Sequence, residues 1–204
     1  MIDRPADNLI SRLRRATRPV HSRLDSSPVA QSLLSPTVSK NNCAVFFSRL
    51  LPVYESLEQP LNRWVERLGL PLELQLSERV AWLHDDLRAL DLPIPKRLDF
   101  EPPLLATPGD AWGALYVLEG SASGARVLEK RLGAPIGLSD GAGGRFLSRC
   151  AAWESQRWER FQSLLNEAPL SDKEARRAEF SATELMTRIA YLMDRQTTRH
   201  NQPA

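Results

Sequence analysis

The stretch EGSASGARVL, residues 119–128, lies in the middle of a segment whose hydrophobic pattern predicts one long helix. Across residues 111–132, leucine, valine and aromatic side chains recur at the three- and four-residue intervals of a helix face. Yet residues 120–125 are all glycine, serine or alanine, and each interior glycine costs a helix about 1 kcal/mol relative to alanine. Such a run makes room for something close to the helix backbone, either a ligand or a tightly packed neighbouring helix.

Composition predicts an ordinary globular protein. The chain has 204 residues, of which 42% are hydrophobic and 25% are charged, a balance typical of folded domains. A net charge of +2 gives no reason to expect a nucleic-acid partner. The N-terminal residues lack the apolar core of a signal peptide, and no run of 18 apolar residues occurs. We therefore expect a single domain over residues 1–204 that is cytoplasmic, monomeric and not bound to a membrane.

The rest of the chain predicts about six helices and no strand, so we expect an all-α fold. Apolar residues recur at helical spacing over residues 9–24, 39–68, 77–90, 108–132, 144–166 and 171–197. Pro52 and Pro60 predict that the second of these helices bends or breaks, and Pro19 predicts a kink or restart in the first. A proline-rich connector over residues 93–108 and a turn-rich segment over residues 134–144 separate the later helices.

Helix-capping residues support several of these boundaries. Ser77 has the position of an N-cap for the third helix. Thr107 with Asp110, and Ser171 with Glu174, have the three-residue spacing of capping boxes.

The residue inventory excludes several kinds of catalytic site. Only His21, His84 and His200 are available as imidazole ligands, and neither HxxxH nor HExxH occurs. No glycine-rich loop follows a strand, which excludes the common nucleotide-binding folds. Ser121 and Ser123 have no nearby base and follow a helix, whereas a nucleophile elbow follows a strand.

His21 is the histidine with the most informative neighbours. Helical periodicity places Arg14, Arg18 and Asp25 on the same side of the first helix as His21. A lone histidine on a helix is usually structural, but here a carboxylate and guanidinium groups accompany it. The helix has five arginines within residues 12–23 and no acidic residue among them. This face is either a solvated surface or a site for an anionic ligand or an acidic partner.

Two segments together resemble the heme oxygenase family, particularly its bacterial branch. The segment LRRATRPVHSRLD, residues 13–25, is similar to the family's proximal-helix pattern of Ala-Thr, three residues and then His. The segment GALYVLEGSASGARVL, residues 113–128, resembles its distal-helix pattern of an aromatic residue, Gly-Ser, two residues and Gly-Ala. Weaker agreement continues to the final helix, so the resemblance spans nearly the whole chain.

The resemblance implies that heme lies between the first helix and a kinked distal helix. It implies that His21 is the proximal iron ligand and that Asp25 orients its imidazole. Basic residues Arg14 and Arg18 would pair with the heme propionates, and Tyr116 would also contact the heme. Four residues would form the distal pocket: Gly120, Ser121, Gly124 and Ala125. Ser121 stands where many members have aspartate, and Ala125 stands where many have a second glycine.

The implied activity is oxidative cleavage of heme to biliverdin, carbon monoxide and ferrous iron. This reaction consumes O2 and electrons from a ferredoxin, a flavodoxin or a reductase. The expected partners are this redox protein, which would be acidic to suit the arginine-rich face, and a downstream bilin acceptor. Two alternatives remain at this stage. The chain could be a non-catalytic heme carrier or sensor on the same fold, or a helical domain for another small molecule or a protein partner.

Overall fold

The computed structural model describes residues 8–76, 78–92 and 98–195, and every regular element within these residues is helical. The elements are α1 (Leu9–Asp25), α2 (Pro28–Leu34), α3 (Lys40–Arg67), a short 3₁₀ helix η1 (Leu72–Leu74), α4 (Arg79–Ala89), α5 (Pro108–Ile136), α6 (Arg145–Glu167) and α7 (Asp172–Asp194). The all-α prediction is therefore confirmed.

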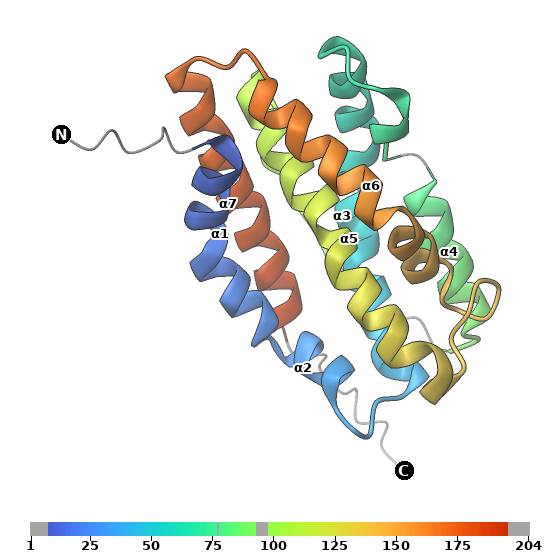
Figure 1. Cartoon of the computed structure of the whole chain (residues 1–204). Helices are drawn as coiled ribbons and strands as arrows, with labels where there is room; N and C mark the ends of the chain where they lie inside the picture. The colour runs from blue at the N-terminus through green and yellow to red at the C-terminus, as the bar shows by residue number, and fades with distance from the viewer. Residues whose placement is uncertain (1–7, 77, 93–97, 196–204) are drawn as a thin grey trace.

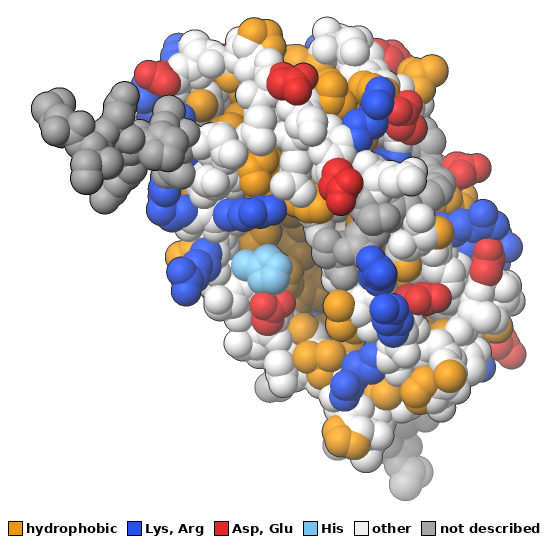
Figure 2. All heavy atoms as spheres, viewed as in Figure 1, with side chains coloured by type: hydrophobic (Ala, Val, Ile, Leu, Met, Phe, Trp, Pro, Cys, Tyr) orange, Lys and Arg blue, Asp and Glu red, His pale blue; other side chains and the backbone are white. Residues whose placement is uncertain are grey.

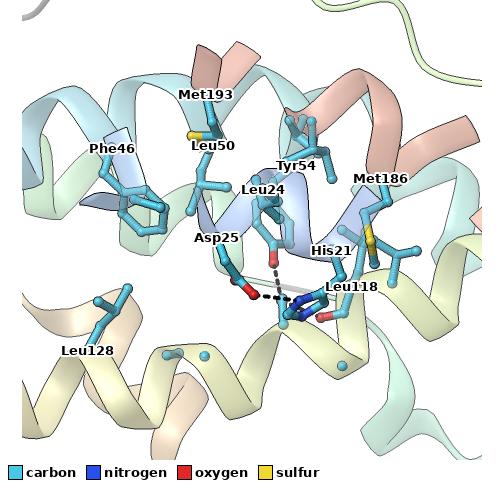
Figure 3. A pocket seen from close by; sticks show the side chains of 18 of the residues that line it. His21, Leu24, Asp25, Phe46, Leu50, Tyr54, Leu118, Leu128, Met186 and Met193 are labelled. Atoms are coloured by element: carbon cyan, nitrogen blue, oxygen red, sulfur yellow. Dashed lines mark hydrogen bonds and ion pairs between the residues drawn. The ribbon is translucent and has the colours of Figure 1, made fainter. Parts of the chain in front are cut away.

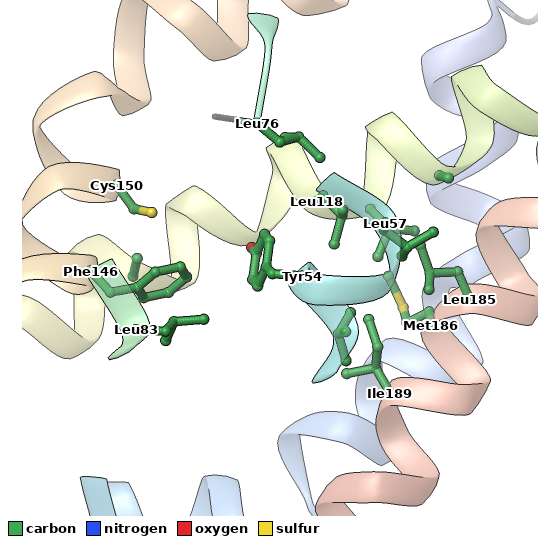
Figure 4. Packing of buried hydrophobic residues seen from close by; sticks show 14 of the residues in the cluster. Tyr54, Leu57, Leu76, Leu83, Leu118, Phe146, Cys150, Leu185, Met186 and Ile189 are labelled. Carbon is green, nitrogen blue, oxygen red and sulfur yellow. The ribbon is translucent and has the colours of Figure 1, made fainter. Parts of the chain in front are cut away.

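α5 is the central helix of the bundle (Figure 1). It packs most extensively against α7 on one side and α6 on the other, and α1 packs against α7. Helix α3 lies behind α5 in this view and packs against α4. The buried side chains of these helices form one continuous hydrophobic core, part of which is drawn in Figure 4. Because α5 packs against helices on both sides, its side chains line the centre of the molecule.

The helix breaks and the restart that proline made possible do not occur. α3 is one helix through Pro52 and Pro60, and α1 continues through Pro19. An interior proline costs a helix about 3 kcal/mol. Against the two prolines, α3 buries seven large apolar side chains, each of which contributes about 1.5–3 kcal/mol: Phe47, Leu51, Val53, Tyr54, Leu57, Leu61 and Val65. Packing of α3 into the core therefore outweighs the backbone penalty.

Two further predictions about the helices need correction. The sequence analysis did not anticipate α2, because a seven-residue helix carries too little hydrophobic periodicity to be recognised. Ser171 does cap α7, but the Glu174 carboxylate does not complete a capping box. It instead accepts a hydrogen bond from the backbone N–H of Gly109 at 2.6 Å, which ties α7 to the start of α5. The predicted N-cap Ser77 lies outside the described residues.

The capping box of α5 is present as predicted. The Thr107 side chain accepts a hydrogen bond from Asp110 N–H, and the Asp110 carboxylate accepts one from Thr107 N–H at 3.0 Å. The helix continues past its expected end to Ile136 and stops at Gly137, which has the left-handed backbone conformation that favours glycine.

A buried ion cluster fixes the middle of α5. The Glu119 carboxylate accepts hydrogen bonds from Arg79 of α4 at 3.0 Å and from Arg157 of α6 at 2.6 and 2.8 Å. Burial alone would raise the pKa of Glu119, but the two guanidinium groups lower it below its ordinary value. Glu119 is thus ionised and joins three helices at the residue that precedes Gly120.

Candidate functional site

A largely apolar cavity of about 330 Å³ opens beside the centre of α5. Figure 2 shows it as a hollow lined by hydrophobic side chains, with a histidine at its edge. Its apolar wall comes from α3, α5, α6 and α7 and includes Phe46, Leu50, Leu128, Phe146, Met186 and Met193. The volume lies in the range of small-molecule sites, so the cavity is large enough to hold a ligand.

His21 and Asp25 form the polar edge of this cavity (Figure 3). The Nδ1 atom of His21 lies 2.9 Å from Oδ2 of Asp25, one turn further along α1. A carboxylate accepts only, so the imidazole donates its Nδ1–H to Asp25 and keeps the lone pair of Nε2 free. The His21 side chain is 60% exposed, and a ligand in the cavity can reach it. The structure thus brings together the predicted ligand and the residue predicted to orient it.

Gly120, Ser121, Gly124 and Ala125 all line the cavity from α5. A Cβ added at Gly124 would meet no protein atom within 4 Å, and one at Gly120 would meet only the Trp158 ring, at an ordinary 3.5 Å. Close packing against a neighbouring helix therefore does not explain these two glycines.

Two other glycines of α5 behave differently. A Cβ at Gly109 would collide with the backbone of Glu174, and one at Gly113 would collide with the backbone of Ala178. Both contacts are with α7, so these residues are small because two helices approach closely. Helix packing thus explains the two glycines in the first turns of α5, which lie outside the small-residue run over residues 120–125. At Gly124 the missing side chain leaves open space in the cavity, and at Gly120 a Cβ would make only an ordinary contact with the Trp158 ring.

Tyr54 is a polar cavity residue that the sequence analysis missed. Its hydroxyl lies 3.3 Å from Oγ of Ser121, and Ser121 donates its single proton to the carbonyl oxygen of Leu118 at 2.7 Å. Tyr54 is therefore the donor in the contact between the two hydroxyls. Burial raises the pKa of Tyr54 above its usual value, so the phenol keeps this proton. No pattern in the sequence distinguishes Tyr54 from the other buried residues of α3.

The remaining predicted residues divide into two groups. Tyr116 lines the cavity, and burial raises the pKa of its hydroxyl, against a hydrogen bond with Thr17 and the positive charge of Arg14. Arg14 and Arg18 are exposed on α1 and do not line the cavity. The Arg14 guanidinium donates to Oε1 of Gln162 at 3.2 Å. The structure thus places Arg14 near Tyr116 and leaves Arg18 on the outer surface.

Within the described residues no cluster of three or more histidine, cysteine, aspartate or glutamate side chains could hold a metal ion. An iron atom in the cavity would therefore depend on a single protein ligand together with a macrocycle. This donor set suits heme better than a bare cation.

Comparison with known proteins decides the family. The model of the family described as Heme oxygenase matches residues 7–187. The chain belongs to the heme oxygenase family. It is accordingly a heme-degrading enzyme, as the resemblance implied, and heme is its ligand.

Individual heme oxygenases agree with this assignment. The chain is 29% identical over 186 residues to heme oxygenase PigA of Pseudomonas aeruginosa, a match that covers 90% of each protein. The solved NO- and CO-bound heme oxygenase of Neisseria meningitidis matches with a TM-score of 0.77 and 25% identity, over 97% of this chain and all of that one. The heme oxygenase of Leptospira interrogans shares the fold, with a TM-score of 0.68, 20% identity, and coverage of 92% and 98%.

The structure also bears on membrane association. Among the helices of the described residues, none combines the length and hydrophobicity needed to span a bilayer.

Proposed function

We propose that heme binds in this cavity between α1 and α5, with His21 as the iron ligand through Nε2, and is cleaved there to biliverdin, carbon monoxide and ferrous iron. One observation carries the proposal: Gly124 has open space beside it in the cavity, and His21 lies on another helix at the same cavity. A flat macrocycle needs both features, a backbone it can approach and an axial ligand.

The cavity residues suit this chemistry. Bound heme would supply the iron at which O2 is reduced and the meso carbon that is oxidised. The apolar side chains exclude bulk water, and small residues on α5 keep protein groups from filling the space beside the macrocycle. Ser121 and Tyr54 are a hydrogen-bonded pair of hydroxyl groups among the residues that line the cavity, and we assign them the task of holding a proton at Tyr54 Oη.

We assign the propionate end of heme to the side of the cavity where Tyr116 and Arg14 lie. Their proximity is reflected in the influence of the Arg14 charge on the Tyr116 hydroxyl. Arg14 can exchange its neutral partner Gln162 for a carboxylate, and an ion pair of this kind is stronger than a hydrogen bond to an amide. Arg18, one turn further along α1, is available as a second cation.

The exposed arginines of α1 also support a partner proposal. Arg14, Arg15 and Arg18 are exposed on α1, the helix that also carries His21. An acidic electron donor, a ferredoxin or flavodoxin, would be attracted to this surface, and the attraction would weaken as salt is added.

The test is a titration of the protein with hemin, followed by addition of ascorbate or a ferredoxin system in air. We expect a Soret band at one equivalent and, after the reductant, its decay as the broad red absorption of biliverdin rises. His21→Ala should lose the ligated spectrum and most of the conversion. His84→Ala is the matched control, because His84 is a partly exposed histidine of α4 that pairs with Glu55 outside the cavity.

Each result has a definite meaning. A stable Soret band that survives the reductant would contradict catalysis and leave a heme carrier. Equal spectra for His21→Ala and His84→Ala would contradict the assignment of the iron ligand. Absence of a Soret band in the wild-type protein would contradict heme binding itself.

A further inference from the structure

Asp86 is a buried carboxylate outside the cavity that no step of the proposed function uses. It lies on α4 and is only 1% exposed. Its Oδ1 accepts the backbone N–H of Arg145 and its Oδ2 accepts the backbone N–H of Phe146, each at 2.7 Å. Asp86 thus binds the first two free amide groups of α6 from a helix far away in sequence.

The N-terminus of α6 needs this outside acceptor. Its N-cap residue is Gly144, and no side chain of the helix's own caps the first turn. A Cβ at Gly144 would lie 2.9 Å from the backbone nitrogen of Ser139, so serine or aspartate does not fit at the N-cap. Asp86 supplies the missing cap, and its negative charge also suits the positive end of the helix dipole.

The first turn of α6 continues into the cavity wall. Phe146 and Leu147 both line the cavity. The Phe146 ring lies against the Tyr54 ring, with centroids 5.4 Å apart and an interplanar angle of 65°, an edge-to-face contact (Figure 4). Tyr54 in turn directs its hydroxyl to Ser121. A continuous series of contacts therefore leads from Asp86 through the backbone and ring of Phe146 to the hydroxyl pair.

We propose that Asp86 is a positioning residue for heme cleavage: by capping α6 it fixes Phe146, and through Phe146 it fixes the Tyr54 hydroxyl against Ser121. This inference rests on the proposed function of the cavity. It adds a residue that does not itself line the cavity and yet sets the geometry of the hydroxyl groups there.

Asp86 also gives this arrangement a dependence on pH. Burial raises the pKa of Asp86 to about 6, against the opposing effect of its two backbone hydrogen bonds. The charged and titratable groups around it are Arg145, Asp140 and Cys150, and on its own helix Asp85, which binds the Arg145 side chain at 2.6 Å. Protonation of Asp86 removes one of the two acceptors that hold the backbone of Arg145 and Phe146, so the aim of Phe146 changes near pH 6, although the folded state holds this proton more tightly than the unfolded state.

The experiment compares four variants with the wild-type protein. Asp86→Ala removes both acceptors, and Asp86→Asn keeps one. Phe146→Leu breaks the ring contact while leaving the cap in place. Asp85→Asn is the matched control, because Asp85 is a partly exposed neighbour that binds the Arg145 guanidinium and not the helix backbone. Each protein is examined for amide hydrogen exchange over residues 145–150 without heme, for hemin affinity, and for the rate of hemin conversion from pH 5 to pH 8.

We expect Asp86→Asn to bind hemin within about threefold of the wild-type affinity and to convert bound hemin about tenfold more slowly, and Phe146→Leu, which alters the cavity wall itself, to convert bound hemin as slowly as Asp86→Asn. Only the Asp86 variants should exchange faster over residues 145–150. The acid-side inflection of the wild-type rate, near pH 6, should disappear in Asp86→Asn. Asp85→Asn should match the wild type in all three measurements.

Two results would overturn the inference. One is conversion by Asp86→Asn and Phe146→Leu at the rate of Asp85→Asn with an unchanged pH profile. The other is a loss of hemin affinity in Asp86→Asn that equals its loss of rate, which would indicate general damage to the cavity. Asp86→Asn and Phe146→Leu keep the test decisive if Asp86→Ala does not fold. Failure of the proposed function is separate, because the wild-type protein would then not convert hemin at all.

Discussion

The imidazole of His21 and the carboxylate of Asp25 are joined by a 2.9 Å hydrogen bond between residues one helical turn apart. α1 is continuous across both residues, so its backbone fixes their spacing. Because Asp25 engages Nδ1, Nε2 is the ring nitrogen of His21 that remains open toward a ligand in the cavity.

Removal of this carboxylate should weaken heme binding without unfolding the protein. We expect Asp25→Ala to lower hemin affinity by about tenfold, as is usual for the partner of a metal-binding histidine. Asp25→Asn should lose less, because its amide oxygen still accepts the Nδ1–H. Spectroscopic titration with hemin gives both affinities. Equal affinities for Asp25→Ala and the wild type would show that Asp25 does not orient His21.

The glycines of α5 should respond to alanine in opposite ways. Gly113→Ala should lower the free energy of unfolding by about 1–3 kcal/mol, because the new methyl group collides with Ala178. Gly124→Ala should keep or raise stability by about 0.5–1 kcal/mol, because alanine favours the helix and meets no protein atom.

Heme binding, in contrast to stability, should depend on the absence of a large side chain at residue 124. Gly124→Val should abolish the Soret band while urea unfolding shows an intact fold, since its side chain enters the cavity. Normal hemin binding by Gly124→Val would rule out the placement of heme against α5.

The Tyr54 hydroxyl should matter for conversion more than for binding. Tyr54→Phe keeps the ring that packs on Phe146 and removes the donor to Ser121. We expect unchanged hemin affinity and a rate lower by about tenfold, the effect of losing a hydrogen bond of about 1.4 kcal/mol. Tyr191→Phe is the control, because that tyrosine is 58% exposed on α7. Equal rates for the two variants would contradict the proton-holding role assigned to the Tyr54 hydroxyl.

The raised pKa of Asp86 makes a prediction about stability. Its value is about 6 in the folded protein and 3.8 ordinarily, so between these pH values the folded state holds a proton that the unfolded state has lost. The contribution of Asp86 to stability is therefore fully present below about pH 4 and is lost as the pH rises through 6. Relative to Asp86→Asn, the wild-type free energy of unfolding should fall by up to about 3 kcal/mol from pH 4 to pH 7. Urea unfolding at several pH values measures this difference, and parallel pH profiles for the two proteins would contradict it.

The sequence anticipated those features that depend on local chemistry. Helical periodicity, the capping residues of α5 and the small residues at its centre are all local patterns, and each corresponds to a feature of the structure. The pairing of His21 with Asp25 was also predictable, because one helix carries both residues. Of the two outcomes predicted at Pro52 and Pro60, a bend or a break, the break does not occur, because the packing that holds α3 together comes from other helices.

The features that the sequence did not reveal depend on contacts between distant residues. Asp86 and Asp85 are adjacent in the sequence. No local pattern distinguishes the carboxylate that caps α6 from the one that is partly exposed and binds the Arg145 side chain. Tyr54 meets Ser121 only because α3 packs beside α5. The difference between Gly113 and Gly124 depends in the same way on where α7 lies.

The two glycine pairs of α5, Gly109 with Gly113 and Gly120 with Gly124, are under different selective pressures. Substitution at Gly109 or Gly113 harms the bundle itself, so any descendant that still folds must retain small residues there. Substitution at Gly120 or Gly124 harms only a protein that still needs a flat ligand beside the helix. A homologue that has abandoned heme while keeping this architecture should therefore be recognisable from α5 alone, with the first pair of glycines preserved and the second pair replaced by larger side chains.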